Sequence, residues 1–250
     1  MTDPAHPELS EDALLGRRVR FRQPRQGYRV AIDPVLLAAA VPAGPGDLVL
    51  DAGAGVGAAA LCLAARVPGC RVVGVEVQRD LARLASDNVA LNGVGDRVEI
   101  VVGDIAAPPP RLAPGTFDHI MVNPPYLEAD KAVSPPHPGK ARANVESTVD
   151  LEVWVRFALV MARAKGSLTF IHRADRMDTL LGALSGAAGD TVVFPLWPAA
   201  GQPAKRVLVR ARKGIMAPMR LAPGLVLHED GGRFTREAEA VLRDAQRLVL

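Results

Sequence analysis

Glycines and acids are spaced so that they could hold a nucleoside. The segment Asp51-Ala-Gly53-Ala-Gly55-Val-Gly57 follows a short apolar run and precedes an alanine-rich stretch. Glycines there allow a tight turn, in which backbone N–H groups at the start of a helix approach a ligand. Glu76, at the end of the next apolar run, could accept hydrogen bonds from ribose hydroxyls. These residues predict a nucleoside-binding loop between a strand and a helix.

The acids favour one of two cofactors. Gly53, Gly55 and Ala58 also satisfy the dinucleotide pattern G-x-G-x-x-G/A, so the glycine spacing alone does not choose. Asp51, two residues before the first glycine, suits the positive sulfonium and amino group of S-adenosylmethionine and would repel a pyrophosphate. Asp104 follows a third apolar run and could accept a hydrogen bond from the adenine amine, although alone it would be an ordinary turn residue. S-adenosylmethionine is therefore the expected cofactor.

A second motif, Asn123-Pro124-Pro125-Tyr126, directly follows a fourth apolar run, 117–122. In open α/β sheets ligands bind at the carboxyl ends of the strands, so this tetrapeptide would face the cofactor. It resembles the fourth motif, (Asn/Asp/Ser)-Pro-Pro-(Tyr/Phe/Trp), of the class I S-adenosylmethionine-dependent N-methyltransferases. The resemblance implies an enzyme that methylates an exocyclic amine.

The same resemblance implies a role for each residue of the motif. An aromatic amine is a weak nucleophile because its lone pair is delocalised into the ring. The Asn123 side-chain oxygen and the Pro124 carbonyl would accept both amine hydrogens and localise that lone pair. Pro125 would restrain the backbone, and Tyr126 would stack on the base. The sulfonium supplies the leaving group, so no metal is expected.

A closer resemblance covers nearly the whole chain. The basic stretch 22–29 followed by 32–37, the pair Lys140 and Arg142, and the stretch 237–242 are similar to the bacterial tRNA(Val) adenine-37 N6-methyltransferase family. The proline-rich stretch 134–138 does not match a pattern of that family. The family resemblance implies methylation of the N6 amine of adenine in RNA, with tRNA as the partner.

Basic residues gather in two acid-free blocks, although the net charge is only +3. Six arginines lie between Leu15 and Ile32, and six basic residues lie between 205 and 220. Such blocks suggest a polyanionic partner, the alternative being two solvated faces. The expected substrate-binding residues are Arg20, Arg22, Arg25, Lys140 and Arg142.

Strands and helices must alternate to position these residues. Seven apolar segments predict strands at 47–51, 71–77, 97–102, 117–122, 167–172, 191–196 and 205–212. Helical patterns lie between most of them, and a last helix is expected over 235–248. The predicted fold is α/β and Rossmann-like, a class I methyltransferase with a mostly parallel seven-stranded sheet and helices on both faces.

The N-terminal region is expected to be an extension of that domain. Residues 1–13 look like a frayed tail, and a turn at 23–27 predicts a β-hairpin. Asp33 and Pro34 then open a helix. The predicted division is 1–46 for tail, basic hairpin and helix, and 47–250 for the methyltransferase domain.

Composition limits the class of protein. Hydrophobic residues make up 49% and charged residues 23% of 250 residues, which excludes a disordered chain. No apolar run is long enough to span a membrane, and no signal peptide pattern is present. The two cysteines, Cys62 and Cys70, match neither a disulfide framework nor a zinc spacing. A cytoplasmic enzyme without a membrane partner is expected.

Three alternatives remain open at this stage. A protein-glutamine N5-methyltransferase uses the same Asn-Pro-Pro-Tyr chemistry, but only fifty residues precede Asp51, and six of them are arginines in one short span. DNA or ribosomal RNA adenine could replace tRNA as the substrate. A non-catalytic nucleic-acid-binding module could also retain the fold.

Overall fold

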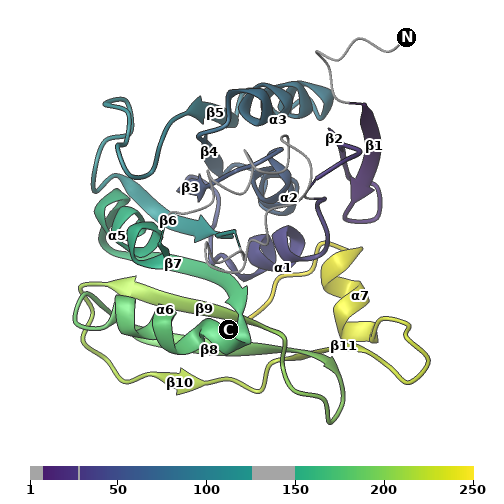
Figure 1. Ribbon diagram of the computed structural model, residues 1–250, viewed down its shortest axis with the longest axis vertical. Coiled ribbons are helices and arrows are strands. Elements are labelled where there is room, and N and C mark those ends of the chain that lie inside the picture. Colours follow the sequence, from purple (N-terminus) through teal and green to yellow (C-terminus); the bar gives the residue numbers. More distant parts are fainter. Residues whose placement is uncertain (1–7, 28, 126–149) are drawn as a thin grey trace, which may run out of the picture.

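A nine-stranded sheet forms the centre of the part of the chain that the computed structural model describes, residues 8–27, 29–125 and 150–250 (Figure 1). Five of its strands are parallel neighbours in the order β5-β4-β3-β6-β7. Their bounds are β3 Leu48–Ala52, β4 Arg71–Glu76, β5 Val98–Val102, β6 Phe117–Val122 and β7 Ala162–Arg173. This arrangement confirms the prediction of a mostly parallel, Rossmann-like sheet.

The other half of the sheet contains both parallel and antiparallel strand pairs. Strand β9 (Arg206–Lys213) is antiparallel to β7 and to β8 (Ala188–Ala199). Two short strands, β10 (Arg220–Leu221) and β11 (Leu225–His228), pair with β8 in parallel. The sequence predicted seven strands, which correspond to β3–β9, and missed these two because two to four residues are too short for a periodic signal.

Helices cover both faces of the sheet. Val49 and Met121 contribute to one hydrophobic cluster, whereas their neighbours Leu50 and Ile120 contribute to the other. Successive strand residues point to opposite faces, so the two clusters lie on opposite sides. The first cluster includes residues of α1 (Asp33–Ala40), α2 (Ala58–Arg66), α3 (Arg79–Leu91) and α7 (Arg236–Leu242), and the second includes residues of α5 (Leu151–Met161) and α6 (Met177–Leu184).

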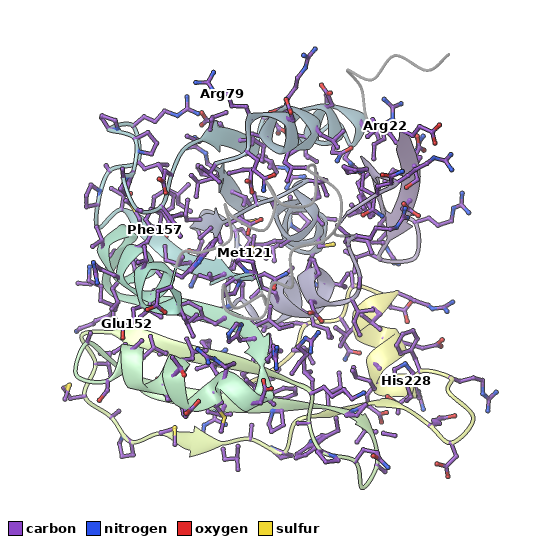
Figure 2. All side chains as sticks on the ribbon, in the orientation of Figure 1. Arg22, Arg79, Met121, Glu152, Phe157 and His228 are labelled. Carbon is purple, nitrogen blue, oxygen red and sulfur yellow. The ribbon has the colours of Figure 1, made fainter. Side chains whose placement is uncertain are left out.

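Individual side chains follow this layering in Figure 2. Met121 on β6 lies near the centre of the view and is completely buried. On α5, Phe157 is buried whereas Glu152 is exposed. A single 3-10 turn, η2 (Ala174–Arg176), precedes α6. In the described ranges, none of the helices combines the length and the apolar character that a membrane span requires.

The last helix is shorter than predicted. It starts after Thr235, whose side chain accepts a hydrogen bond from Ala238 N, and it ends at Leu242 rather than at 248. Ala245 has a positive φ of 61°, which a continuing α-helix does not permit. The predicted extension to 248 was therefore wrong.

The N-terminal hairpin is present, but its turn lies elsewhere. Strand β1 (Leu9–Leu14) pairs antiparallel with β2 (Val19–Pro24), so the turn is at 15–18 rather than at 23–27. Strand β2 buries Val19, Phe21 and Gln23 and exposes Arg20 and Arg22, which alternate with them. None of the residues of strand β1 is fully buried. Because no face of this strand packs in the core, its sequence lacks the alternation of apolar and polar residues by which a strand is predicted. Residues 9–13, expected as tail, are therefore part of the hairpin.

The hairpin shares its core with the rest of the chain. Val19, Phe21 and residues of α1 belong to the same hydrophobic cluster as α2. The division of the chain at residue 46 stays a prediction.

Candidate active site

The pairing of strands brings the predicted motifs together. Ala52, the last residue of β3, is in register with Val75 on β4 and with Val122 on β6. Gly53, the residue after β3, therefore lies between Glu76 at the end of β4 and Asn123 directly after β6. Because these strands are parallel, their carboxyl ends meet at one edge of the sheet, where a ligand binds.

The glycine loop is held by β4 and needs glycine for two different reasons. Gly53 N and Ala54 N both donate to Val75 O at 2.9 Å. Gly53 has a φ of +72°, and a Cβ there would lie 2.6 Å from Cη2 of Trp154 on α5. Gly55 also has a positive φ, +55°, but among residues 8–27, 29–125 and 150–250 a Cβ on it would meet nothing within 4 Å. The loop therefore packs at Gly53 and leaves open space at Gly55.

Gly57 completes the loop. It is the N-cap residue of α2, with a left-handed φ of +85°. Its Cβ position lies 3.4 Å from Cβ of Ala85 on α3, so the loop turns tightly between the two helices. Helix α2 therefore starts at the carboxyl edge of the sheet, where a helix N-terminus can bind a ligand. The role of the loop in binding a nucleoside stays a prediction.

Glu76 tethers the same loop. Its carboxylate accepts hydrogen bonds from Gly55 N at 2.8 Å and from Gln78 N at 2.9 Å, and the residue is only 6% exposed. Glu76 thus fixes the backbone around the open position at Gly55. Its predicted contact with the ribose of the cofactor stays a prediction.

Asp51 lies buried beneath the loop. Its carboxylate accepts a hydrogen bond from Ala60 N at 3.1 Å, and the residue is 2% exposed. Burial raises the pKa of Asp51 to about 7; the Ala60 hydrogen bond opposes that shift, and the negative charge of Glu76 adds to it. A positive charge nearby would favour the ionised form of this carboxyl.

Asp104 lies beside the same edge. Gly103 N donates to Glu76 O at 3.0 Å, which fixes the start of the loop after β5 next to the end of β4. The exposed Asp104 carboxylate accepts from Ala106 N at 2.8 Å, which is the turn role that the sequence also allowed. Its contact with an adenine amine stays a prediction.

The second motif begins where β6 ends. Asn123 is half-buried, Pro124 is buried and Pro125 is exposed. Tyr126, Lys140 and Arg142 lie outside the described residues, so their predicted roles stay predictions. The catalytic roles of Asn123, Pro124 and Pro125 are likewise predictions, to which the structure adds their position beside the glycine loop.

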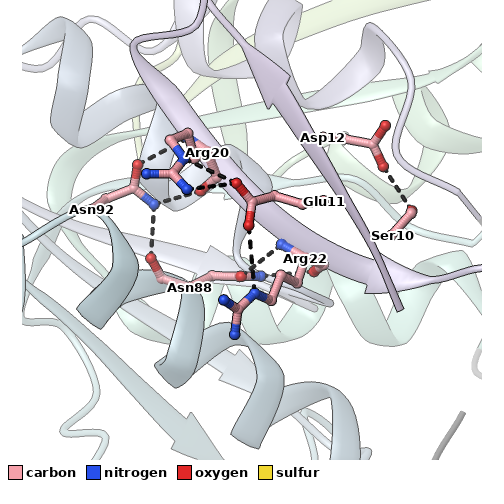
Figure 3. Close-up of polar contacts among 7 residues, drawn as sticks. All are labelled: Ser10, Glu11, Asp12, Arg20, Arg22, Asn88 and Asn92. Atoms are coloured by element: carbon pink, nitrogen blue, oxygen red, sulfur yellow. Dashed lines mark hydrogen bonds and ion pairs between the residues drawn. The ribbon is translucent and has the colours of Figure 1, made fainter. Parts of the chain in front are cut away.

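The acid-free block in the sequence suggested that the hairpin arginines lie apart from acids. In the structure they form ion pairs with carboxylates. Glu11 on β1 accepts from Arg20 Nη2 at 2.6 Å and lies 3.7 Å from Arg22 Nε (Figure 3). Arg25 Nε lies 3.8 Å from Glu8. Glu11 lies on β1 and Glu8 directly precedes it, in the stretch 1–13 that was predicted to be a tail. The side chains of Arg20, Arg22 and Arg25 remain more than half exposed, at 56%, 51% and 60%.

Two residues of the site region were not predicted from the sequence. The ring of Trp154 on α5 occupies the space beside Gly53. Its buried Nε1 has no hydrogen-bond partner among the described residues. Asn88 on α3 bonds both the glycine loop and the hairpin. A signal for it exists, since this amide lies four residues after Leu84 on the buried helix face.

These residues fit S-adenosylmethionine. The described residues leave space at Gly55, the buried Trp154 Nε1 has no hydrogen-bond partner among them, and two buried acids suit a positively charged ligand. Together with the Rossmann-like sheet, they define a class I methyltransferase. The chain is an S-adenosylmethionine-dependent methyltransferase.

Comparisons with known proteins agree with this class and identify the family within it. A family model described as "Methyltransferase domain" matches residues 49–135. The tRNA1(Val) (adenine(37)-N6)-methyltransferase of Porphyromonas gingivalis is 34% identical over 178 residues, which cover 69% of each chain. The chain belongs to the tRNA1(Val) (adenine(37)-N6)-methyltransferase family, as its sequence resemblance predicted.

Two further proteins are similar either at lower sequence identity or over a shorter segment. A crystal structure of a predicted O-methyltransferase, protein Atu636 from Agrobacterium tumefaciens, has a TM-score of 0.72 at 25% identity and covers 87% of this chain and 98% of that one. The release factor glutamine methyltransferase of Chlorobaculum tepidum is 38% identical, but over only 80 residues, 32% of this chain and 27% of that one.

Proposed function

We propose that this enzyme transfers a methyl group to N6 of adenine 37 in tRNA1(Val), the reaction for which its family is named. The observation that carries the proposal is the register of Ala52 with Val122. It sets Asn123 beside Gly53, so an amine held by the second motif would lie next to a cofactor held by the first. S-adenosylmethionine, when bound, supplies an electrophilic methyl group on a sulfonium.

Residues of this chain would polarise the amine of the substrate and balance the positive charge of the cofactor. The Asn123 side-chain oxygen and the Pro124 carbonyl would accept the two N6 hydrogens and direct the lone pair out of the ring. Pro125, which has no N–H and a fixed φ, would hold that carbonyl in place. Asp51 would oppose the positive charge of the cofactor from beneath the loop.

The hairpin supports RNA as the partner. Residues 8–29 contain six arginines and three acids, Glu8, Glu11 and Asp12, so the hairpin has a surplus of three positive charges even after pairing. Exposed ion pairs of this kind are worth only about 0–1 kcal/mol, so phosphates could replace the carboxylates as partners. We propose that Arg20, Arg22 and Arg25 contact the RNA backbone, together with Lys140 and Arg142.

We propose that the reaction needs no metal, because the sulfonium is itself the leaving group. A cytoplasmic location follows from the proposed substrate.

The experiment is methylation of a tRNA1(Val) transcript with labelled S-adenosylmethionine, followed by nucleoside analysis. We expect N6-methyladenosine from this transcript, and none when guanine replaces adenine at position 37. Label at another adenine would overturn the position, and cofactor binding without turnover on total tRNA from a strain lacking the gene would favour a non-catalytic module.

Protein glutamine is the second candidate, which the 80-residue match to a release factor glutamine methyltransferase favours. Purified release factor, assayed beside the transcript, separates the two. Transfer to the factor but not to the RNA would reverse our assignment.

A further inference from the structure

A second cavity lies at the opposite edge of the sheet from the glycine loop. Its volume is about 380 Å³, and it is bordered by the start of β6 at Asp118, the start of β7 and the end of β9. Asp118 and Asn123 stand at the two ends of the same strand, so at about 3.3 Å per residue the two edges are roughly 17 Å apart. This cavity is therefore separate from the active site.

Basic side chains dominate the lining of this cavity. Five of them contribute, namely Arg163, Lys165, Arg210, Arg212 and Arg247. Two acids also line it: Asp118 pairs with Arg163 at 2.9 Å, and Asp190 lies 3.7 Å from Arg212. In the part of the chain that the structure describes, Arg210 donates to Leu250 O, whereas Lys165 and Arg247 form no ion pair with a carboxylate. The cavity therefore holds uncompensated positive charge.

The basic groups are also close to one another. Arg210 Nη2 and Arg220 Nη2 donate to the same oxygen, Leu250 O, at 3.1 and 2.9 Å. Burial lowers the pKa of Arg210, and the charges of Arg220 and Arg247 lower it further. Leu250 O already joins Arg210 and Arg220, so the cations of the lining that an added anion would compensate are Lys165 and Arg247.

The backbone around the cavity is irregular at two of the residues that line it. Lys165 and Asp190 have left-handed φ angles of +62° and +50°. The strand register shifts between Phe117 and His119 on β6, opposite Lys165, and between Gly189 and Val192 on β8, around Asp190. Such bulges redirect side chains. A left-handed backbone at a residue other than glycine costs free energy, and residues strained in this way cluster at functional sites.

We propose that this cavity binds a phosphate ester. Guanidinium groups recognise phosphate oxygens through paired, charge-assisted hydrogen bonds, and a lysine adds a mobile point charge. The volume is at the lower end of the range for small-molecule sites, roughly 300–1,000 Å³, which gives room for an esterified phosphate. A free nucleotide and a phosphodiester of bound RNA share this chemistry, and the proposal does not depend on methyl transfer.

The first test uses inorganic pyrophosphate as the probe and calorimetry as the readout. The enzyme is saturated with S-adenosylhomocysteine, so that the glycine loop is filled. We expect saturable one-to-one binding that weakens at least tenfold in Lys165→Asn and in Arg247→Gln. Asparagine tolerates the left-handed backbone at 165, so that variant removes the charge without adding strain.

A matched control removes a distant charge. Arg233→Gln removes an arginine that is 85% exposed and pairs with Glu229 outside the cavity. It should leave pyrophosphate binding unchanged, and all three variants should keep the melting temperature and S-adenosylhomocysteine affinity of the unaltered enzyme. Absence of saturable binding, or equal weakening in all three variants, would overturn the proposal.

The second test identifies the source of the phosphate. RNA binding is measured at several salt concentrations with the same variants. A slope of log K against log salt that is shallower in Lys165→Asn and Arg247→Gln assigns the cavity to the RNA backbone. An unchanged slope together with lost pyrophosphate binding assigns it to a free phosphate ester.

Discussion

The side chain of Asn88 pairs with both backbone polar groups of Arg22: its Oδ1 accepts from Arg22 N at 2.7 Å, and its Nδ2 donates to Arg22 O at 2.9 Å (Figure 3). The same Nδ2 donates to Val56 O in the glycine loop at 3.0 Å. Asn88 is fully buried. One amide therefore joins the hairpin proposed to bind RNA to the loop that holds the cofactor.

Asn88→Ala should destabilise the fold and weaken cofactor binding together. The substitution removes the partner of the buried Val56 O and of the partly buried backbone groups of Arg22, which costs about 1–3 kcal/mol. Urea denaturation and calorimetry with S-adenosylmethionine measure the two effects. Asn92→Ala is the control, because Asn92 pairs with the backbone of Arg20 on the exposed side and has no bond to the loop. If the two variants bind the cofactor equally well, the link through Val56 is unimportant.

The affinity for S-adenosylmethionine should rise with pH through about 7. Asp51 has a folded-state pKa near 7, above its ordinary value near 4. Its contribution to the stability of the free enzyme is therefore present below pH 4 and is lost as the pH rises to 7. A cationic ligand prefers the ionised form, so affinity should increase by up to tenfold per pH unit below 7. Calorimetry in buffers of different ionisation enthalpy should detect proton release on binding.

Asp51→Asn provides the control for that titration. The amide keeps the shape but cannot ionise, so the pH dependence of binding between 5 and 8 should disappear and the affinity should be lower at pH 8. A variant that retains the pH dependence of the unaltered enzyme would transfer the titration to another group, Glu76 being the nearest acid to test.

Asn123→Ala should lower kcat by roughly 10²-fold or more and leave cofactor affinity nearly unchanged. The side-chain oxygen is expected to act mainly in the transition state, where positive charge develops on N6. Single-turnover kinetics on the tRNA transcript and calorimetry with the cofactor separate the two quantities. Full turnover in this variant would make Asn123 a turn residue and would refute the mechanism.

Gly55→Ala should abolish cofactor binding at a small cost in stability. The new methyl group meets no atom of the described residues within 4 Å, so we expect it to occupy space left for the ligand. The left-handed φ of +55° adds a strain of about 1 kcal/mol. Gly115→Ala is matched to it, with a φ of +72° and equally empty surroundings before β6. Both variants should melt slightly earlier, but only Gly55→Ala should lose S-adenosylmethionine; equal binding would mean that the ligand does not approach Gly55.

Replacing Arg20, Arg22 and Arg25 together by Ala should flatten the salt dependence of RNA binding. The slope should change by about one unit for each arginine that contacts a phosphate. Glu11→Gln should act in the opposite direction and tighten binding, because it removes the carboxylate that pairs with Arg20 and Arg22. Cofactor affinity should stay constant in both. Parallel lines for the triple variant and the unaltered enzyme would show that these arginines are solvated surface.

The sequence determined the local elements of this protein wherever a residue pattern was long enough to repeat. Alternation and apolar runs predicted β3–β9, because a buried strand needs apolar side chains at fixed spacing. The same reasoning failed for β1, which buries no residue fully, and for the two-residue β10. It also placed the hairpin turn too late, because the sequence 23–27 contains turn residues that the structure uses after β2 rather than inside the hairpin.

The sequence also determined which chemical groups are present at the site, since the glycines, Asp51, Glu76 and Asn123 could be selected by type and spacing. Only the tertiary structure decided their neighbours. Asn123 lies beside Gly53, seventy residues earlier in the chain, because β6 hydrogen-bonds to β3 and not to β5. Likewise the arginines of β2 face acids because Glu11 lies opposite Arg22 in the register of the hairpin. Strand order and register arise from contacts between distant segments, and a local residue pattern does not encode them.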